Sequence, residues 1–117
     1  MIVKTSELLL GILFFFVAHI LTFYQLNGQF IWKSFQKHEW AVAGAGVIIS
    51  YFFIWGTRYT VEGTGGLLWP ARFIGFGIGM LLYASFVSFH FSEGITLKTL
   101  VSLALCVALI SVQLFWK

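Results

Sequence analysis

His19 is the residue whose type and position best fit chemistry inside a membrane, because it is the one ionisable group deep within a long apolar run. Ionisable side chains are costly in lipid and generally face a cavity or the interior of a helix bundle. Histidine also exchanges a proton near neutral pH. The alternative interpretation is a neutral imidazole that hydrogen-bonds to a neighbouring helix. The sequence therefore leaves two roles open for His19, a coupling-proton site and a structural hydrogen bond.

Charged residues also gather around the connection between the second and third apolar runs. Glu62 lies in the predicted loop, Arg58 precedes it and Arg72 follows it in the first turn of the next run. A pair formed by Arg72 and Glu62 would be suited to gate the mouth of a cavity. An ordinary ion pair at the membrane surface is the alternative, and such a pair contributes little to stability. Arg72 is therefore a candidate for contact with a substrate or a coupling ion.

Aromatic residues supply candidates for a box around an organic cation, because a cation is attracted to the face of an aromatic ring. Aromatic residues make up 20% of the chain, so most of them must simply pack or face lipid. The four candidates for the box, spread over the second and third apolar runs, are Tyr51, Trp55, Trp69 and Tyr83.

Patterns typical of catalysis, metal binding and cofactor binding are missing from the sequence. His90 and Glu93 are three residues apart and would meet on one helix face, but two ligands do not make a metal site. The run 63–66 (GTGG) lacks the lysine that follows in a phosphate-binding loop. Cys106 is alone, so it can form neither a disulfide nor a thiolate metal site within one chain. We expect no enzymatic activity, no metal and no cofactor.

The composition is that of an integral membrane protein. The chain has 117 residues, of which 60% are hydrophobic and 9% are charged, whereas soluble domains have roughly 25% charged residues. A bilayer span takes about 20 residues, so the length allows four spans with short loops. The net charge of +3 reflects basic residues that flank the spans and does not indicate nucleic-acid binding. We expect an all-α polytopic protein with a single domain, residues 1–117, in the lipid bilayer, and no cleaved signal peptide.

Helix-start and helix-stop residues bound the four predicted spans. Thr5 or Ser6 would cap the first span and Asn27-Gly28 would end it, while Thr96 would cap the fourth. Between the first two spans aromatic and polar residues are interleaved, which favours a short helix in the membrane interface. The loop between the second and third spans is predicted over residues 60–66. The spans cover about residues 7–24, 40–59, 67–91 and 97–116.

The third span carries a row of small residues. Ala71, Gly75 and Gly79 are four residues apart and share one helix face. Small residues at this spacing let a second helix approach closely in lipid. Pro70 lies in the first turn, where a helix tolerates proline. We therefore expect this face to pack against another helix.

Basic residues divide almost evenly between the two sides of the membrane. Four spans place both termini and the second loop on one side. Because the division is four against three, the sequence does not fix the orientation, and we favour termini inside the cell, in a cytoplasmic or inner membrane. The first side has Lys4, Arg58, Arg72 and Lys117, and the other has Lys33, Lys37 and Lys98.

Several local patterns resemble those of one known family. Ala18-His19-Ile20 falls where that family has alanine, a membrane-embedded glutamate and an aliphatic residue, the run 75–79 (GFGIG) resembles its glycine-rich packing motif, and residues 91–97 (FSEGITL) resemble its polar turn before the last helix. In these motifs the chain is similar to the small multidrug resistance proteins and other four-helix members of the drug/metabolite transporter superfamily. The resemblance implies proton-coupled export of cations by an antiparallel homodimer. The chain departs from the family where His19 replaces the coupling carboxylate, and where the tryptophan just before the glycines is missing.

Two functions follow from these patterns. The first is a small transporter, a homodimer that couples the movement of a small organic or cationic compound to protons. It would enclose a polar chamber faced by His19 and by aromatic residues of the first or second span. The alternative is a non-catalytic auxiliary or structural subunit that docks onto a larger membrane complex through its glycine face. A transporter needs polar groups that converge on a cavity. The predicted spans have few of them, namely His19, Thr22, Ser50, Ser85, Ser88 and Gln113.

Overall fold

The computed structural model describes residues 3–116, and this part of the chain is all-helical, as predicted. Four of its helical segments are long and apolar enough to cross a membrane, namely Thr5–Phe30, Glu39–Gly63, Leu68–His90 and Leu97–Phe115. The helices are α1 (Thr5–Asn27), the 3-10 helix η1 (Gly28–Phe30), α2 (Lys33–Lys37), α3 (Glu39–Gly44), α4 (Gly46–Gly63), α5 (Leu68–His90) and α6 (Leu97–Phe115).

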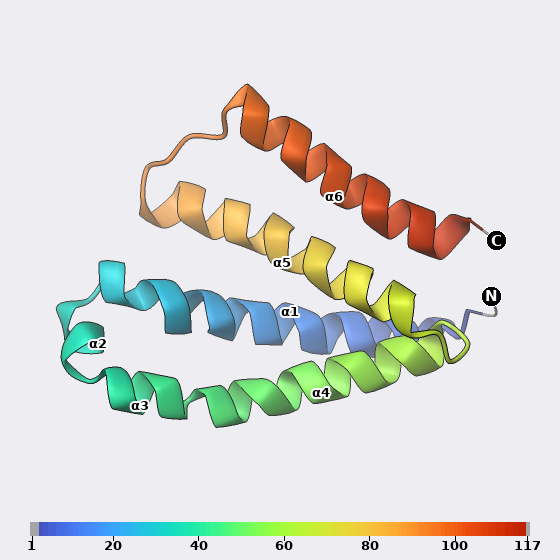
Figure 1. Cartoon of the computed structure of the whole chain (residues 1–117), viewed down its shortest axis with the longest axis horizontal. Helices are drawn as coiled ribbons and strands as arrows, with labels where there is room; N and C mark the ends of the chain where they lie inside the picture. The colour runs from blue at the N-terminus through green and yellow to red at the C-terminus, as the bar shows by residue number, and fades with distance from the viewer. Residues whose placement is uncertain (1–2, 117) are drawn as a thin grey trace.

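The long helices are arranged as a bundle of three with a fourth helix at its edge (Figure 1). α1 packs on both α4 and α5, and α4 also contacts α5, whereas α6 packs on α5. Successive long helices run in opposite directions, so both described ends of the chain lie on the same side as the α4–α5 connection (Figure 1). The short helices η1 and α2 lie at the opposite side, between α1 and α3 (Figure 1).

α1 and α4 approach each other so closely that only glycine fits at two positions of their contact. A Cβ atom added to Gly11 would lie 2.6 Å from the backbone nitrogen of Thr60, and one added to Gly63 would lie 2.5 Å from the backbone nitrogen of Leu8. The backbone N–H of Lys4 also donates a hydrogen bond of 2.7 Å to the carbonyl of Gly63. Because these neighbours are backbone atoms, they cannot move aside, and the contact between the helices is fixed.

Phe15 is the centre of the three-helix contact. It is 4% exposed, and its ring lies between a glycine of α4 and a glycine of α5. A Cβ atom on Gly56 would be 2.8 Å from the ring, and one on Gly75 would be 3.3 Å from it. The small-residue face of α5 therefore lies against α1, with Ala71 buried at its start. Gly77, on another side of α5, lies against Ile110 of α6.

The structure corrects the predicted start of α1 and the predicted second loop. α1 begins at Thr5 with Lys4 as its N-cap, and no side chain caps it, because a lysine side chain has no acceptor for a helix N–H. The Ser6 hydroxyl donates to Glu7 instead. α4 continues to Gly63, so the loop prediction for residues 60–63 is wrong. The buried Thr64 hydroxyl donates to the carbonyl of Thr60 at 2.9 Å and closes the last turn. The turn itself uses Gly65 and Gly66, which have φ of 76° and 87°.

Other boundaries agree more closely with the sequence. α1 ends at Asn27, and the hydroxyl of Thr96 caps α6 by accepting a hydrogen bond from the N–H of Thr99. The short helix expected between the first two spans is present as α2. The second span is interrupted at Ala45, where the α3–α4 boundary lies between Gly44 and Gly46.

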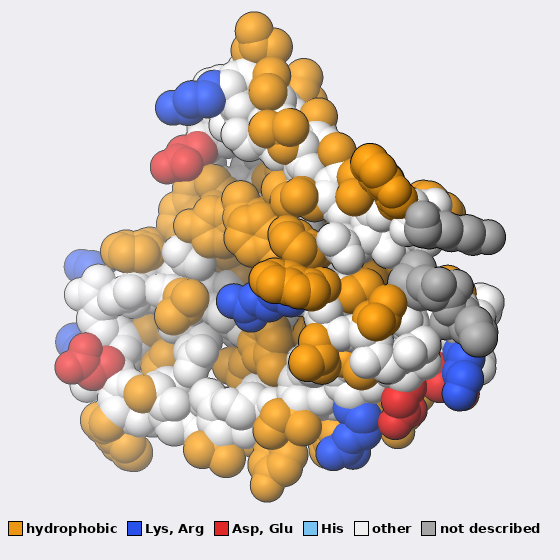
Figure 2. All heavy atoms as spheres, turned by 45° about the vertical axis from the view of Figure 1, so that its right-hand side comes forward, with side chains coloured by type: hydrophobic (Ala, Val, Ile, Leu, Met, Phe, Trp, Pro, Cys, Tyr) orange, Lys and Arg blue, Asp and Glu red, His pale blue; other side chains and the backbone are white. Residues whose placement is uncertain are grey.

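The surface of the folded chain is largely apolar. Figure 2 shows hydrophobic side chains across the middle of one face, while most acidic and basic side chains lie toward its edges. α6 contributes strongly to this surface, since Leu97, Leu105 and Phe115 are 77%, 61% and 77% exposed. This distribution is the one that a helix bundle needs in order to contact lipid tails.

Candidate functional site

A cavity of about 540 Å³ lies among α1, α4 and α5. Its wall is mostly apolar, and the polar side chains that line it are those of His19, Thr57 and Arg72. Pockets that bind small molecules typically have volumes of about 300–1,000 Å³, an apolar lining and a few placed polar groups. The cavity therefore brings together two of the residues that the sequence singled out, His19 and Arg72.

The imidazole of His19 is held between aromatic rings and the glycine face of α5. The ring of Phe53 meets it edge-on, with centroids 5.1 Å apart and planes at 88°. A Cβ atom on Gly79 would lie 2.5 Å from the Cε1 atom of the imidazole, so a side chain at that position would push the ring away. A Cβ atom on Gly75, one turn earlier on α5, would lie 3.3 Å from the ring of Phe15. Glycine at these positions thus leaves the space in which His19 lies.

The spacing of the lining residues along each helix indicates where His19 and Arg72 lie in the cavity. On α1, Phe15 and His19 are four residues apart and share a face, as do Phe53 and Thr57 on α4. On α5, Arg72 precedes Gly79 by seven residues, which is about 10 Å along a helix axis. Arg72 therefore lies toward the end of the cavity where α5 begins, and His19 lies toward the middle of the bundle.

The predicted pairing of Arg72 with Glu62 is not found. Because α4 extends to Gly63, Glu62 lies in the last turn of that helix, where it is exposed. The side-chain hydrogen bonds and ion pairs of residues 3–116 include none between Glu62 and Arg72. Arg58 is exposed on α4 and is not among the residues that line the cavity. Arg72 thus lines the cavity without Glu62, the carboxylate with which it was expected to form a gate.

The four aromatic candidates do not come together in this chain. The rings of Tyr51 and Trp55 lie on α4 with centroids 5.7 Å apart. Trp69 is 70% exposed in the first turn of α5. Tyr83 lies about one turn beyond Gly79, the last glycine of α5, and lines a different cavity. None of the four lines the cavity that contains His19.

His90 and Glu93 do not share a helix face, so that expectation is wrong. α5 ends at His90, and the chain leaves the helix through Ser92, whose φ is 56°. The Nε2 atom of His90 lies 2.9 Å from the hydroxyl oxygen of Tyr24, which joins the end of α5 to α1. Within residues 3–116 no group of three or more His, Cys, Asp or Glu side chains is arranged to hold a metal ion.

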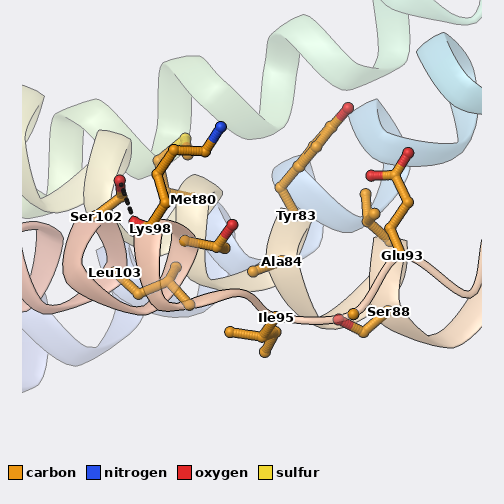
Figure 3. A pocket seen from close by; sticks show the side chains of 12 residues that line it. Met80, Tyr83, Ala84, Ser88, Glu93, Ile95, Lys98, Ser102 and Leu103 are labelled. Atoms are coloured by element: carbon orange, nitrogen blue, oxygen red, sulfur yellow. Dashed lines mark hydrogen bonds between the residues drawn. The ribbon is translucent and has the colours of Figure 1, made fainter.

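A second cavity, of about 320 Å³, lies between α5 and α6 (Figure 3). Figure 3 shows the side chains of Glu93 and Lys98 on either side of Tyr83, and the hydroxyl of Ser102 bonded to the carbonyl of Lys98. The sequence interpretation did not identify this cavity. A signal was present in the two opposite charges that flank the predicted turn before α6, but their position beside Tyr83 depends on how α5 and α6 pack.

Comparison with protein-family models, with curated proteins and with solved structures finds no match to this chain. The resemblance to small multidrug resistance proteins therefore stays a prediction.

Proposed function

We propose that this chain is a multi-pass membrane protein that binds a small organic compound in the cavity among α1, α4 and α5 and moves it across the bilayer. The observation that supports this proposal is the convergence of His19, Thr57 and Arg72 on one cavity of about 540 Å³. Polar side chains are costly in membrane-spanning helices and generally mark functional cavities, so their convergence from three helices favours a binding site over a purely structural role.

His19 is the residue that takes and releases the coupling proton in this proposal. Lipid offers an imidazole no hydrogen-bond partner, so the side chain must find its partners inside the bundle or in a wet chamber. The half-buried ring lines the cavity, where it can reach both a bound compound and water. Proton binding and compound binding would then change the same local charge, and each would affect the other.

The four long helices cross the bilayer in this account, with both termini on the cytoplasmic side of a cytoplasmic or inner membrane. α2 would lie in the interface, where Trp32 and Phe35 contact each other with ring centroids 5.1 Å apart beside Lys33 and Lys37. Aromatic rings and basic residues are favoured at that depth. We further propose a homodimer, because α6 packs on α5 and leaves most of its own apolar side chains exposed.

The test compares uptake of radiolabelled probes into proteoliposomes and into protein-free liposomes, because a monovalent anion that moves with one proton carries no net charge and gives no current. Uptake of ethidium, tetraphenylphosphonium and phenylbutyrate is measured at several pH values. Wild-type protein is expected to give uptake above the protein-free level with at least one probe, and the pH dependence of this uptake is expected to disappear in His19→Gln. The proposal fails if every probe gives the protein-free signal, or if His19→Gln keeps the full pH dependence.

An auxiliary subunit of a larger membrane complex is the second candidate. The observation that favours it is α6, whose exposed apolar side chains run along its whole length. Purification from native membranes in a mild detergent distinguishes the two candidates. A transporter is expected to elute as a monomer or homodimer, whereas a subunit is expected to elute in fixed proportion with other proteins.

A further inference from the structure

We infer that the compound bound among α1, α4 and α5 carries one negative charge on an apolar body, as a monocarboxylate with an aromatic or aliphatic tail does. This inference rests on the proposed function and specifies its substrate class. It differs from the organic cation that the family resemblance implies.

The charges around the cavity favour an anion. Arg72 is the permanently charged side chain among the lining residues, and no acidic residue lines the cavity. The chain has four acidic residues, and they lie elsewhere, in the first turn of α1, at the start of α3, in the last turn of α4 and in the α5–α6 connection. An organic cation would therefore meet the charge of Arg72 with no carboxylate to offset it. An anion would find its counter-charge in place.

The chemistry of arginine favours a carboxylate as the anionic group. Its planar guanidinium stays protonated and can bind a carboxylate through two parallel hydrogen bonds. The hydroxyl of Thr57 lines the same cavity and can donate a further hydrogen bond. Bonds of this kind are strongest where water is excluded. Arg72 and Thr57 are exposed in the isolated chain, so the bound compound itself must exclude water by packing its body against Phe15 and Phe53.

The apolar wall of the cavity fits the apolar body of such a compound. Phe15 and Phe53 line the part of the cavity next to His19, while Phe76 lies on α5 one turn from Arg72. A compound with its carboxylate at Arg72 would lay its apolar tail along these rings toward His19. Among the residues of α1, α4 and α5 that line the cavity, Arg72 is the one permanently charged group. Protonation of His19 would add a second positive charge and so strengthen the attraction for the anion.

The phosphate of a membrane lipid offers the guanidinium a similar anionic partner, since arginine side chains near helix ends reach toward headgroups. We commit to a soluble carboxylate, and the experiment separates the two sources. Binding is measured by isothermal titration calorimetry in maltoside micelles, which contain no phosphate, and in phosphatidylcholine nanodiscs. The probes are phenylbutyrate, phenylbutylamine and phenylbutanol, which share one body and differ in charge.

Phenylbutyrate is expected to bind about 10- to 100-fold more tightly than phenylbutanol in both lipid and detergent, the range that hydrogen bonds to charged groups support. Arg72→Gln should bind the acid and the alcohol equally, and Arg72→Lys should keep part of the preference. Arg58→Gln is the matched control, because Arg58 is exposed on α4 outside the cavity, and it should behave as wild type. Circular dichroism and size-exclusion profiles establish that each variant is folded.

The outcomes separate this inference from the proposed function. If phenylbutylamine or phenylbutanol binds at least as tightly as phenylbutyrate, the cavity binds small compounds but the inferred charge is wrong. A preference for the acid that appears in maltoside and vanishes in nanodiscs assigns Arg72 to lipid phosphate and also overturns the inference. If none of the three probes binds above empty nanodiscs and micelles, both the inference and the binding function at this cavity fail.

Discussion

The bundle of α1, α4 and α5 and the helix α6 are both apolar enough to span a membrane, but the bundle is closely packed and α6 is largely exposed. In the bundle, glycines face backbone atoms or aromatic rings at distances that no larger residue would permit, as at Gly11 and Gly56. α6 packs on α5, and Cys106 is the buried residue that it contributes among residues 97–115. His19 and Arg72, whose side chains could bind a proton or an anion, belong to helices of the closely packed bundle. In this chain, therefore, close packing marks the region that contains the candidate site, whereas hydropathy does not distinguish it from α6.

The largest effect is expected where α1 meets α4. Gly11→Leu places a side chain against the backbone of Thr60, which cannot move aside. Overpacking typically costs 1–3 kcal/mol and sometimes more, and here we expect about 3 kcal/mol or loss of folded protein. Unfolding by sodium dodecyl sulfate, followed by circular dichroism, measures the change.

Gly44→Leu is the matched control for this prediction, because a Cβ atom at Gly44 has no neighbour within 4 Å. It should unfold close to wild type. Equal stability of Gly11→Leu and Gly44→Leu would show that α1 and α4 are not in contact at Gly11, and the comparison would lose its basis.

An intermediate effect is expected at the glycine beside the imidazole. Gly79→Ala adds a methyl group within 3 Å of the His19 ring, so the ring must leave its place or the helices must separate. We expect a loss of stability of about 1 kcal/mol and a drop of at least tenfold in phenylbutyrate affinity. Gly94→Ala, in the open α5–α6 connection, serves as control and should change neither quantity. Unchanged phenylbutyrate affinity in Gly79→Ala would show that His19 is not part of the binding site.

The smallest effect is expected on the outer face of α6. Leu105 is 61% exposed, and surface substitutions generally change stability by no more than about 0.5 kcal/mol. In detergent that dissociates the proposed homodimer, Leu105→Ala should therefore leave the unfolding of the monomer unchanged. A cost well over 1 kcal/mol in monomeric protein would show that this face of α6 packs within the chain, and the contrast between bundle and outer helix would be wrong.

Helix identity and several helix ends were predictable, because their causes are local. Asn27-Gly28 ends α1 and Thr96 caps α6 through its own hydroxyl. The extension of α4 to Gly63 was not predictable in this way. It depends on the buried hydroxyl of Thr64 and on the contact of Lys4 with Gly63, residues far apart in the sequence.

The candidate site was predictable only in part for the same reason. His19 stands out because a titratable group in an apolar run is rare, and Arg72 stands out by its charge. Nothing local indicates that the two line one cavity, since that depends on α1 packing against α5. Thr57 was missed altogether, because a single threonine in an apolar helix has no distinguishing pattern and gains a role only from its neighbours in space.

The most direct test of the account is the number of protons taken up when phenylbutyrate binds. Calorimetry in buffers with different ionisation enthalpies gives this number near neutral pH. We predict net uptake by the wild type, because an anion at Arg72 favours the protonated form of His19, and no uptake by His19→Gln. His38→Gln and His90→Gln, whose imidazoles lie outside the cavity, should keep the wild-type value. Binding without proton uptake in the wild type, or equal uptake in His19→Gln, would contradict the central claim that His19 is the proton site of this cavity.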